Sequence, residues 1–194
     1  MKANINSIEL AYDIHGRGYP LVLLHAFPLN RTMWEPQVKA LSNLVQIITL
    51  DFRGFGESKM KDEATTMDLL ADDVYALLKD LSIEKVILGG LSMGGYVAFA
   101  FFRKYPEMVK ALILASTRAG ADTEEGKANR ISMAEQVMKK GTKIVAEQMT
   151  PRLLGTITQK QNPELVTRIK KIISSASPAA IAQAQRGMAL RPDS

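Results

Sequence analysis

The sequence predicts an α/β protein with a mostly parallel sheet flanked by helices. Two observations lead to this prediction. Short apolar, β-rich runs alternate with helical patterns through the first 118 residues, whereas the residues that follow show helical spacing alone. Alternating strand and helix signals are typical of βαβ units, whose crossover connections make neighbouring strands parallel. We therefore expect a sheet-based core in residues 1–118 and a separate helical region in residues 119–190.

The strands are expected in the following order. Residues 8–14 alternate apolar with polar or small side chains, which is typical of a half-buried strand, and a turn at residues 15–18 follows. More continuous apolar runs predict strands that are covered on both faces. These runs are residues 21–24, 45–50, 86–88 and 111–115.

Two helices are expected between these strands. The first should follow Thr65 or Thr66, either of which can cap its first turn. The second should cover residues 96–103. The apolar residues of the first helix recur at helical spacing and form one stripe: Leu70, Val74, Leu77, Leu78 and Leu81.

Residues after Thr117 predict short helices. Their apolar side chains, such as Ile131, Met138 and Ile173, suit either a cap lying over another layer or an ordinary helical subdomain. Periodicity leaves that choice open. The breaks between helices are expected at Gly141, Pro151, Gly155, Pro163 and Pro178.

Composition narrows the classes of function. The chain has 194 residues, 46% of them apolar, and contains no cysteine, so disulfides, thiolate metal sites and a cysteine nucleophile are excluded. No apolar run is long enough for a membrane span, and no secretory signal precedes the core, so we expect a cytoplasmic protein without a membrane partner. The net charge of +5 arises wholly after residue 118, among helical spacings without interleaved aromatics. Solvated helix faces therefore explain it better than a nucleic-acid partner.

A glycine-rich turn around Ser92 is the central motif. The segment Gly90-Leu-Ser-Met-Gly94 comes directly after the predicted strand at 86–88 and before a predicted helix. In that context, Gly-x-Ser-x-Gly predicts a nucleophile elbow, a sharp strained turn that exposes the serine. The serine would lie at the carboxyl edge of the sheet, where open α/β sheets bind ligands.

The turn after the strand at 21–24 should lie at the same edge. His25-Ala-Phe-Pro28 follows that strand directly. Acyl transfer needs two backbone N–H groups near the developing oxyanion, one from the residue after the nucleophile and one from an earlier loop. Met93 and Phe27 are the candidates. Without the serine turn, a simple strand-ending turn would explain this loop equally well.

A third segment, residues 51–58, favours a structural role. Gly54 and Gly56 suit positive φ, while Asp51, Arg53 and Ser58 can satisfy turn backbone or form local pairs. No dinucleotide, P-loop or metal-ligand spacing is complete anywhere in the sequence, so no cofactor is expected.

Together these three motifs resemble the α/β-hydrolase family, in particular its small esterase and enol-lactonase branch. The resemblance covers nearly the whole chain, including Met33-Trp34, with Ala26 where many members have glycine. It implies that Ser92 is the nucleophile, that Phe27 and Met93 form the oxyanion hole, and that residues 119–190 are a cap over the acyl pocket. It also implies that the core continues from residues 191–194 into two further strands carrying the triad acid and histidine.

The histidine that should activate Ser92 is missing from the expected place. Such hydrolases order their triad as serine, acid, histidine, yet His15 and His25 both precede Ser92. Each has a structural place in the motifs, so neither is expected to act as the base. The downstream acids, such as Asp122 and Asp193, would have no histidine to orient. We therefore expect an incomplete hydrolase whose isolated chain is nearly inactive.

The expected function is hydrolysis of small-molecule esters or lactones through an acyl-enzyme on Ser92. Two alternatives remain: perhydrolase or haloperoxidase-like chemistry on the same fold, and a non-catalytic binding module. A serine rather than an aspartate at the elbow argues against a dehalogenase. Without the two further strands that the resemblance implies, the strand at 111–115 should be an exposed edge of the sheet. Such an edge favours self-association or pairing with a complementing carboxyl-terminal segment.

Overall fold

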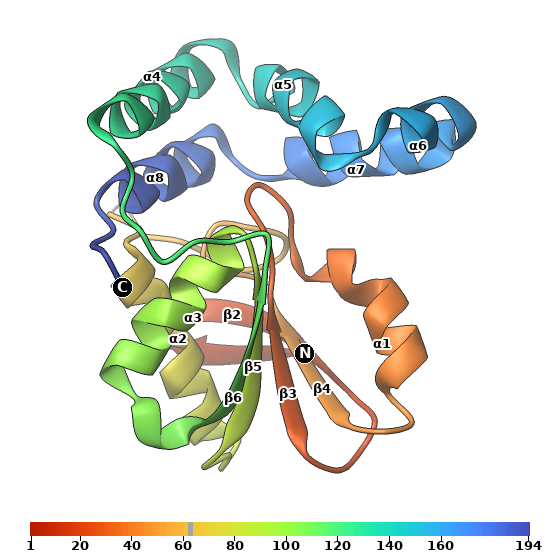
Figure 1. The fold of residues 1–194 in the computed structure, drawn as a ribbon, viewed down its shortest axis with the longest axis vertical. Helices are drawn as coiled ribbons and strands as arrows, with labels where there is room; N and C mark the ends of the chain where they lie inside the picture. The colour runs from red at the N-terminus through yellow and green to blue at the C-terminus, as the bar shows by residue number, and fades with distance from the viewer. Residues whose placement is uncertain (62–63) are drawn as a thin grey trace.

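The computed structural model describes residues 1–61 and 64–194, and shows a twisted sheet with helices on both faces beneath a layer of further helices (Figure 1). The strand order is β1-β2-β4-β3-β5-β6. Strands β4, β3, β5 and β6 run parallel, while β1 and β2 are antiparallel to their neighbours. This arrangement confirms the α/β class and the mostly parallel sheet. The strands are β1 (Lys2–Ile5), β2 (Ile8–His15), β3 (Pro20–Leu24), β4 (Gln46–Leu50), β5 (Val86–Leu91) and β6 (Val109–Ala115).

The strands differ from the predictions at three places. Strand β1 was not predicted, because its polar and apolar residues alternate over only four positions, which is too short a pattern to read as a strand. It pairs antiparallel with β2 through the backbone. Strand β5 extends to Leu91 and includes Gly89 and Gly90. The continuous apolar run in β6 predicted a strand covered on both faces, and that prediction is wrong, whereas the separate expectation of an exposed edge agrees with its place in the sheet. Ile113 and Leu114 are 50% and 43% exposed, because β6 is the last strand in the sheet order.

The core helices cover the two faces of the sheet. Helix α1 (Glu35–Leu41) follows a 3-10 turn at Arg31–Trp34, and α2 (Met67–Asp80) and α3 (Met93–Lys104) pack against each other. Thr66 caps α2, since its Oγ1 accepts a hydrogen bond of 3.1 Å from the Leu69 N–H. Helix α3 begins at Met93, three residues before the predicted start, so the serine turn leads directly into it.

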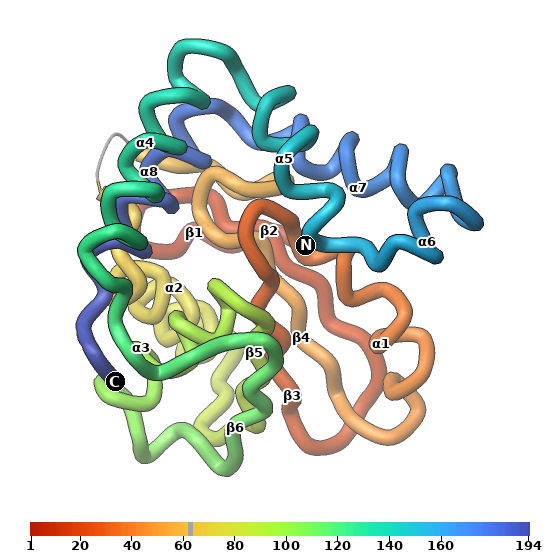
Figure 2. The backbone as a smooth tube through the Cα atoms, turned by 45° about the horizontal axis from the view of Figure 1, so that its top comes forward, coloured from red at the N-terminus to blue at the C-terminus, as the bar shows by residue number. Residues whose placement is uncertain are grey.

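The remaining helices form a layer over the carboxyl edge of the sheet (Figures 1 and 2). Helix α4 packs along α8, and α5 packs along α7. The layer contacts the core closely: a Cβ at Gly187 in α8 would overlap the Thr65 carbonyl oxygen, and Arg168 pairs with Glu35 at 2.6 Å. The helices are α4 (Glu124–Lys140), α5 (Lys143–Leu153), α6 (Thr156–Gln161), α7 (Pro163–Ser175) and α8 (Pro178–Ala189).

Two predictions about this helical layer are wrong. Pro151 lies inside α5, near its carboxyl end, rather than between helices. At this position proline, which has no N–H, removes one backbone hydrogen bond of the helix without ending it. Ile131 and Met138 are 40% and 55% exposed rather than packed, whereas Ile173 is fully buried. No helix within the two described ranges has both the length and the apolar character needed to cross a bilayer.

Candidate active site

Ser92 occupies a strained turn between β5 and α3. Its φ of 53° and ψ of −110° lie in a region that non-glycine residues rarely adopt. The turn is held from the neighbouring strand: the Ser92 N–H donates to the Ala115 carbonyl at 2.9 Å, and the Thr117 hydroxyl donates to the Ser92 carbonyl at 3.0 Å. The end of β6 therefore fixes the backbone of the serine.

Two glycines allow this turn to form. A Cβ at Gly90 would overlap the backbone of Gly94, and a Cβ at Gly94 would overlap the carbonyl oxygen of Leu24 in β3. Glycine is therefore required by close backbone approach rather than by dihedral freedom. Its absence of a side chain brings the serine turn against the end of β3.

The loop after β3 brings Phe27 into the same cavity as Ser92. Met93 follows the serine as the first residue of α3. Within the described residues, neither the Phe27 N–H nor the Met93 N–H donates a hydrogen bond to the protein. Free N–H groups from these two positions are what an oxyanion hole requires.

His25 lies in this loop but is buried away from the cavity. Its Nδ1 lies 3.0 Å from the Ala26 carbonyl, and its Nε2 accepts from the Phe52 N–H at 3.0 Å. Burial lowers its pKa to about 4, although Asp51 acts in the opposite direction. His25 is therefore a neutral structural group with both ring nitrogens engaged.

His15 is also far from Ser92. It is the last residue of β2 and pairs with Ile47, near the start of β4. Because β2 is antiparallel to β4, this position lies at the amino ends of the parallel strands, opposite the edge that carries Ser92. The structure brings neither histidine into the serine cavity.

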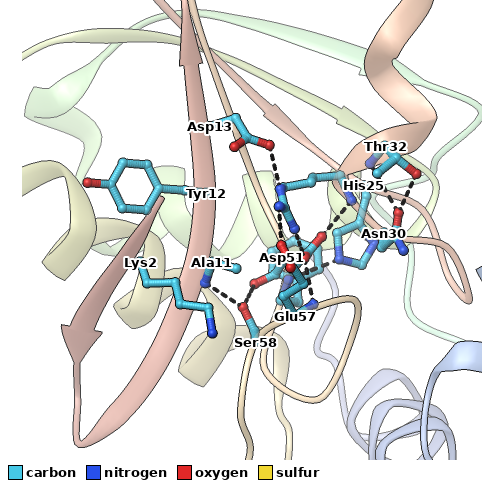
Figure 3. A network of polar contacts seen from close by, with 12 residues as sticks. Lys2, Ala11, Tyr12, Asp13, His25, Asn30, Thr32, Asp51, Glu57 and Ser58 are labelled. Atoms are coloured by element: carbon cyan, nitrogen blue, oxygen red, sulfur yellow. Dashed lines mark hydrogen bonds and ion pairs between the residues drawn. The ribbon is translucent and has the colours of Figure 1, made fainter.

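Asp51 is the centre of a polar network beneath the loop after β3 (Figure 3). Its carboxylate accepts from the Arg31 N–H at 2.7 Å, from the Arg31 guanidinium and from the Glu57 N–H at 2.9 Å. Its carbonyl accepts from the Ser58 hydroxyl at 2.7 Å. The hydroxyl oxygen of Ser58 in turn accepts from the Ala11 N–H at 2.8 Å. These bonds tie the loop to the sheet and agree with the structural role expected for residues 51–58.

The rest of this segment is also structural. Gly54 and Gly56 have φ of 80° and 53°, as their place in the turn predicts. Arg53 is buried and pairs with Asp73 of α2 at 2.7 Å. That pair spans twenty residues, so the expectation of a purely local pair was too narrow. Asn6 also bonds Asp73, at 2.9 Å.

A cavity of about 540 Å³ opens beside Ser92. Helices α4, α5 and α8 supply most of the residues that line its wall. The sequence did not single out Arg118 or Arg130, which also line the cavity. The available signal for Arg118 was its place just after β6, at the same sheet edge as Ser92.

Asp122 forms the electrostatic centre of this wall. Its side chain is 1% exposed, and it pairs with Arg118, with Arg130 and, at 3.1 Å, with Arg191. Burial raises its pKa, but hydrogen bonds from Arg130, Arg118 and Arg191 outweigh that effect and lower the pKa to about 2. Arg191 also lies over the Tyr96 ring, 4.0 Å from its centroid.

Known proteins are similar to this chain over its core and helical layer. A solved thermophilic esterase from Thermogutta terrifontis, with malate bound, is 45% identical with a TM-score of 0.94, and the match covers 100% of this chain and 73% of that one. A 3-oxoadipate enol-lactonase of Acinetobacter baylyi is 32% identical over 128 residues, which are 65% of this chain and 48% of that protein. A non-heme chloroperoxidase of Kitasatospora aureofaciens is 37% identical over 91 residues, 46% of this chain and 33% of that protein.

The chain thus spans less than half the length of the two curated relatives named above. The family model for the alpha/beta hydrolase fold matches residues 19–189. That match takes in the serine turn, the loop after β3 and the helical layer, which are the features that form the cavity. The chain therefore belongs to the α/β-hydrolase family, as its motifs indicated.

Proposed function

We propose that this chain carries the nucleophile and the oxyanion donors of a serine hydrolase for carboxylic esters or lactones. The observation that carries the proposal is the strained backbone of Ser92 beside a cavity that Phe27 shares. The Ser92 hydroxyl would attack the carbonyl carbon, while the N–H groups of Phe27 and Met93 hold the oxyanion. The alcohol would leave with the proton, and water would then release the acid from the acyl-enzyme.

We further propose that the base and its acid come from outside residues 1–194. The two histidines of this sequence are structural or distant, as described above. Serine proteases that lose the triad histidine lose about 10⁶ in turnover, and we expect a loss of that order for a serine without a nearby base. The residues at hand would then bind and orient an ester but hydrolyse it slowly.

The names of the relatives bear on the kind of hydrolase. The esterase and the enol-lactonase favour acyl transfer to water. The chloroperoxidase favours a second candidate, in which the same serine forms an acyl intermediate that hydrogen peroxide cleaves to a peracid. Both candidates use Ser92 in the same role, and peroxide-dependent formation of peracid would separate them.

The first experiment measures hydrolysis of p-nitrophenyl acetate and butyrate together with fluorophosphonate labelling. Intact-mass analysis would first establish where the purified chain ends. We expect near-background hydrolysis and slow labelling at Ser92 that Ser92→Ala abolishes. Ser82→Ala is the matched control, since Ser82 is an exposed serine with a similar φ of 56°.

Two results would contradict the proposal. Labelling that persists in Ser92→Ala would remove Ser92 as the nucleophile. Rapid hydrolysis that depends on Ser92 would keep the nucleophile but show that a base within this chain, or in a second copy of it, is sufficient.

A further inference from the structure

We propose that the cavity beside Ser92 recognises a carboxylate on its ligand, so that the preferred substrates are esters or lactones whose acyl part also carries an acid group. The inference rests on the proposed function for the scissile bond. Recognition of the carboxylate itself requires no turnover, and the two ideas can fail separately.

The cavity wall carries an excess of positive charge. Arg118, Arg130 and Arg152 line it together with Ser92, and Asp122 is the acid among the lining residues that the structure describes. Each guanidinium stays charged at any ordinary pH. A neutral ligand in this cavity would form no ion pair with these arginines.

Asp122 does not neutralise the excess. Its carboxylate is buried and already pairs with Arg118, Arg130 and Arg191, so one negative charge faces three positive charges. Asp122 is thus a positioning residue that fixes the direction of the guanidiniums. Its own oxygens are covered and do not repel an incoming anion strongly.

Two of these arginines keep donors that a ligand can reach. The side chains of Arg118 and Arg130 are 57% and 20% exposed, whereas that of Arg191 is 4% exposed. A guanidinium has five N–H donors in a planar fork, and the pair with Asp122 uses part of them. The remaining donors suit a carboxylate, which arginine binds in a bidentate manner.

The other lining residues fit a short, polar ligand. Met133, Met149 and Met188 supply apolar contacts, while Gln136 and Gln148 add further polar groups from α4 and α5. A volume of about 540 Å³ accommodates a small dicarboxylic half-ester. A long alkyl ester would instead bury polar side chains without hydrogen-bond partners.

The test is a binding measurement with two esters of the same shape. In the Ser92→Ala background, which removes turnover, calorimetry would compare monomethyl glutarate with the uncharged half-amide, methyl 5-amino-5-oxopentanoate. We expect the charged ester to bind at least about tenfold more tightly, with the advantage falling as salt rises. Equal affinities, or no binding of either probe at millimolar concentration, would overturn the proposal.

Variants assign the effect to the arginines. Arg118→Gln and Arg152→Gln should each weaken binding of the charged ester about fivefold or more and leave the half-amide unchanged. Arg17→Gln is the matched control, because Arg17 is exposed in the turn between β2 and β3, at the opposite edge of the sheet. Circular dichroism would confirm that each variant is folded. Unchanged affinity in both Arg118→Gln and Arg152→Gln would contradict the assignment.

Because the probes bind without reacting, the outcome is independent of hydrolysis. If the charged ester binds more tightly but Ser92 is not labelled, the carboxylate site is supported and Ser92 is rejected as the nucleophile. Labelling at Ser92 together with equal affinities would do the reverse.

Discussion

Two ion clusters at the carboxyl edge of the sheet have opposite charge patterns. Beneath the loop after β3, one arginine meets three carboxylates, whereas in the cavity wall one carboxylate meets three arginines. The members of the first cluster are Arg31, Asp13, Asp51 and Glu57. The members of the second are Asp122, Arg118, Arg130 and Arg191.

The two clusters do different physical work. Asp51 accepts from backbone N–H groups as well as from a side chain, so the first cluster fixes the course of two loops. Asp122, in contrast, accepts hydrogen bonds from three arginine side chains, and two of these arginines line the cavity. The difference teaches that buried ion pairs near a site can either hold its backbone or fix the direction of charged side chains that line its cavity.

Replacing Asp51 should have the largest effect on stability. Asp51→Asn would leave the Arg31 guanidinium, which is 11% exposed, without its buried partner. We expect a loss of roughly 3–5 kcal/mol in the free energy of unfolding, measured by urea denaturation. Asp13→Asn is the control, since Asp13 is 37% exposed, and it should cost less than about 1 kcal/mol. Equal costs for the two variants would refute the structural importance of Asp51.

His25 should make the stability of the fold sensitive to acid. Its pKa is about 4 in the folded protein, below the ordinary value of 6.5, because it is fully buried. Between these two pH values the folded state binds fewer protons than the unfolded state. The free energy of unfolding should therefore fall as the pH drops from 6.5 to 4. The loss should reach about 3 kcal/mol. Urea denaturation at pH 7 and pH 4.5 would measure it, and His25→Asn should flatten this part of the profile.

Asp122 should show a smaller effect in a more acidic range. Its pKa of about 2 lies below the ordinary 3.8, so its contribution is present above 3.8 and lost as the pH falls through 2. The contribution should be about 2 kcal/mol. Asp122→Asn should remove that dependence in thermal melts between pH 4 and pH 2. A variant with the full acid dependence of the parent chain would show that other carboxylates cause it.

The exposed edge of β6 should have the smallest effect, and one that depends on concentration. Because Ile113 and Leu114 are exposed on the last strand of the sheet order, we expect the purified chain to self-associate through this edge. Light scattering should show less association in Ile113→Lys. Leu44→Lys is the control, since Leu44 is 69% exposed elsewhere. A monomer at all concentrations would contradict the prediction.

Local patterns were sufficient for most of the core. Runs such as residues 21–24 and 45–50 are continuously apolar, and buried parallel strands require that. Patterns failed for β1, whose four residues owe their conformation to pairing with β2. They also failed at Pro151, because spacing alone does not distinguish a proline inside a helix from one between helices.

The candidate site divides in the same way. Ser92, Phe27 and Met93 could be proposed from the sequence, because each lies in or next to a turn that directly follows a strand, and short-range geometry fixes such turns. Arg118 and Arg130 lie in a loop and a helix whose relation to Ser92 depends on how α4 and α8 pack over the sheet. Residue spacing along the chain does not predict how these helices pack over the sheet.

By itself, the sequence determined the alternation of most core strands and helices, the serine turn and the lack of a histidine in residues 93–194. The tertiary structure alone decided that His25 is buried and neutral, that Asp51 and Asp122 are cluster centres, and that arginines face the serine cavity. The physical reason is range. Periodicity and turn chemistry act over a few residues, whereas burial and charge pairing join groups that only the folded chain brings together.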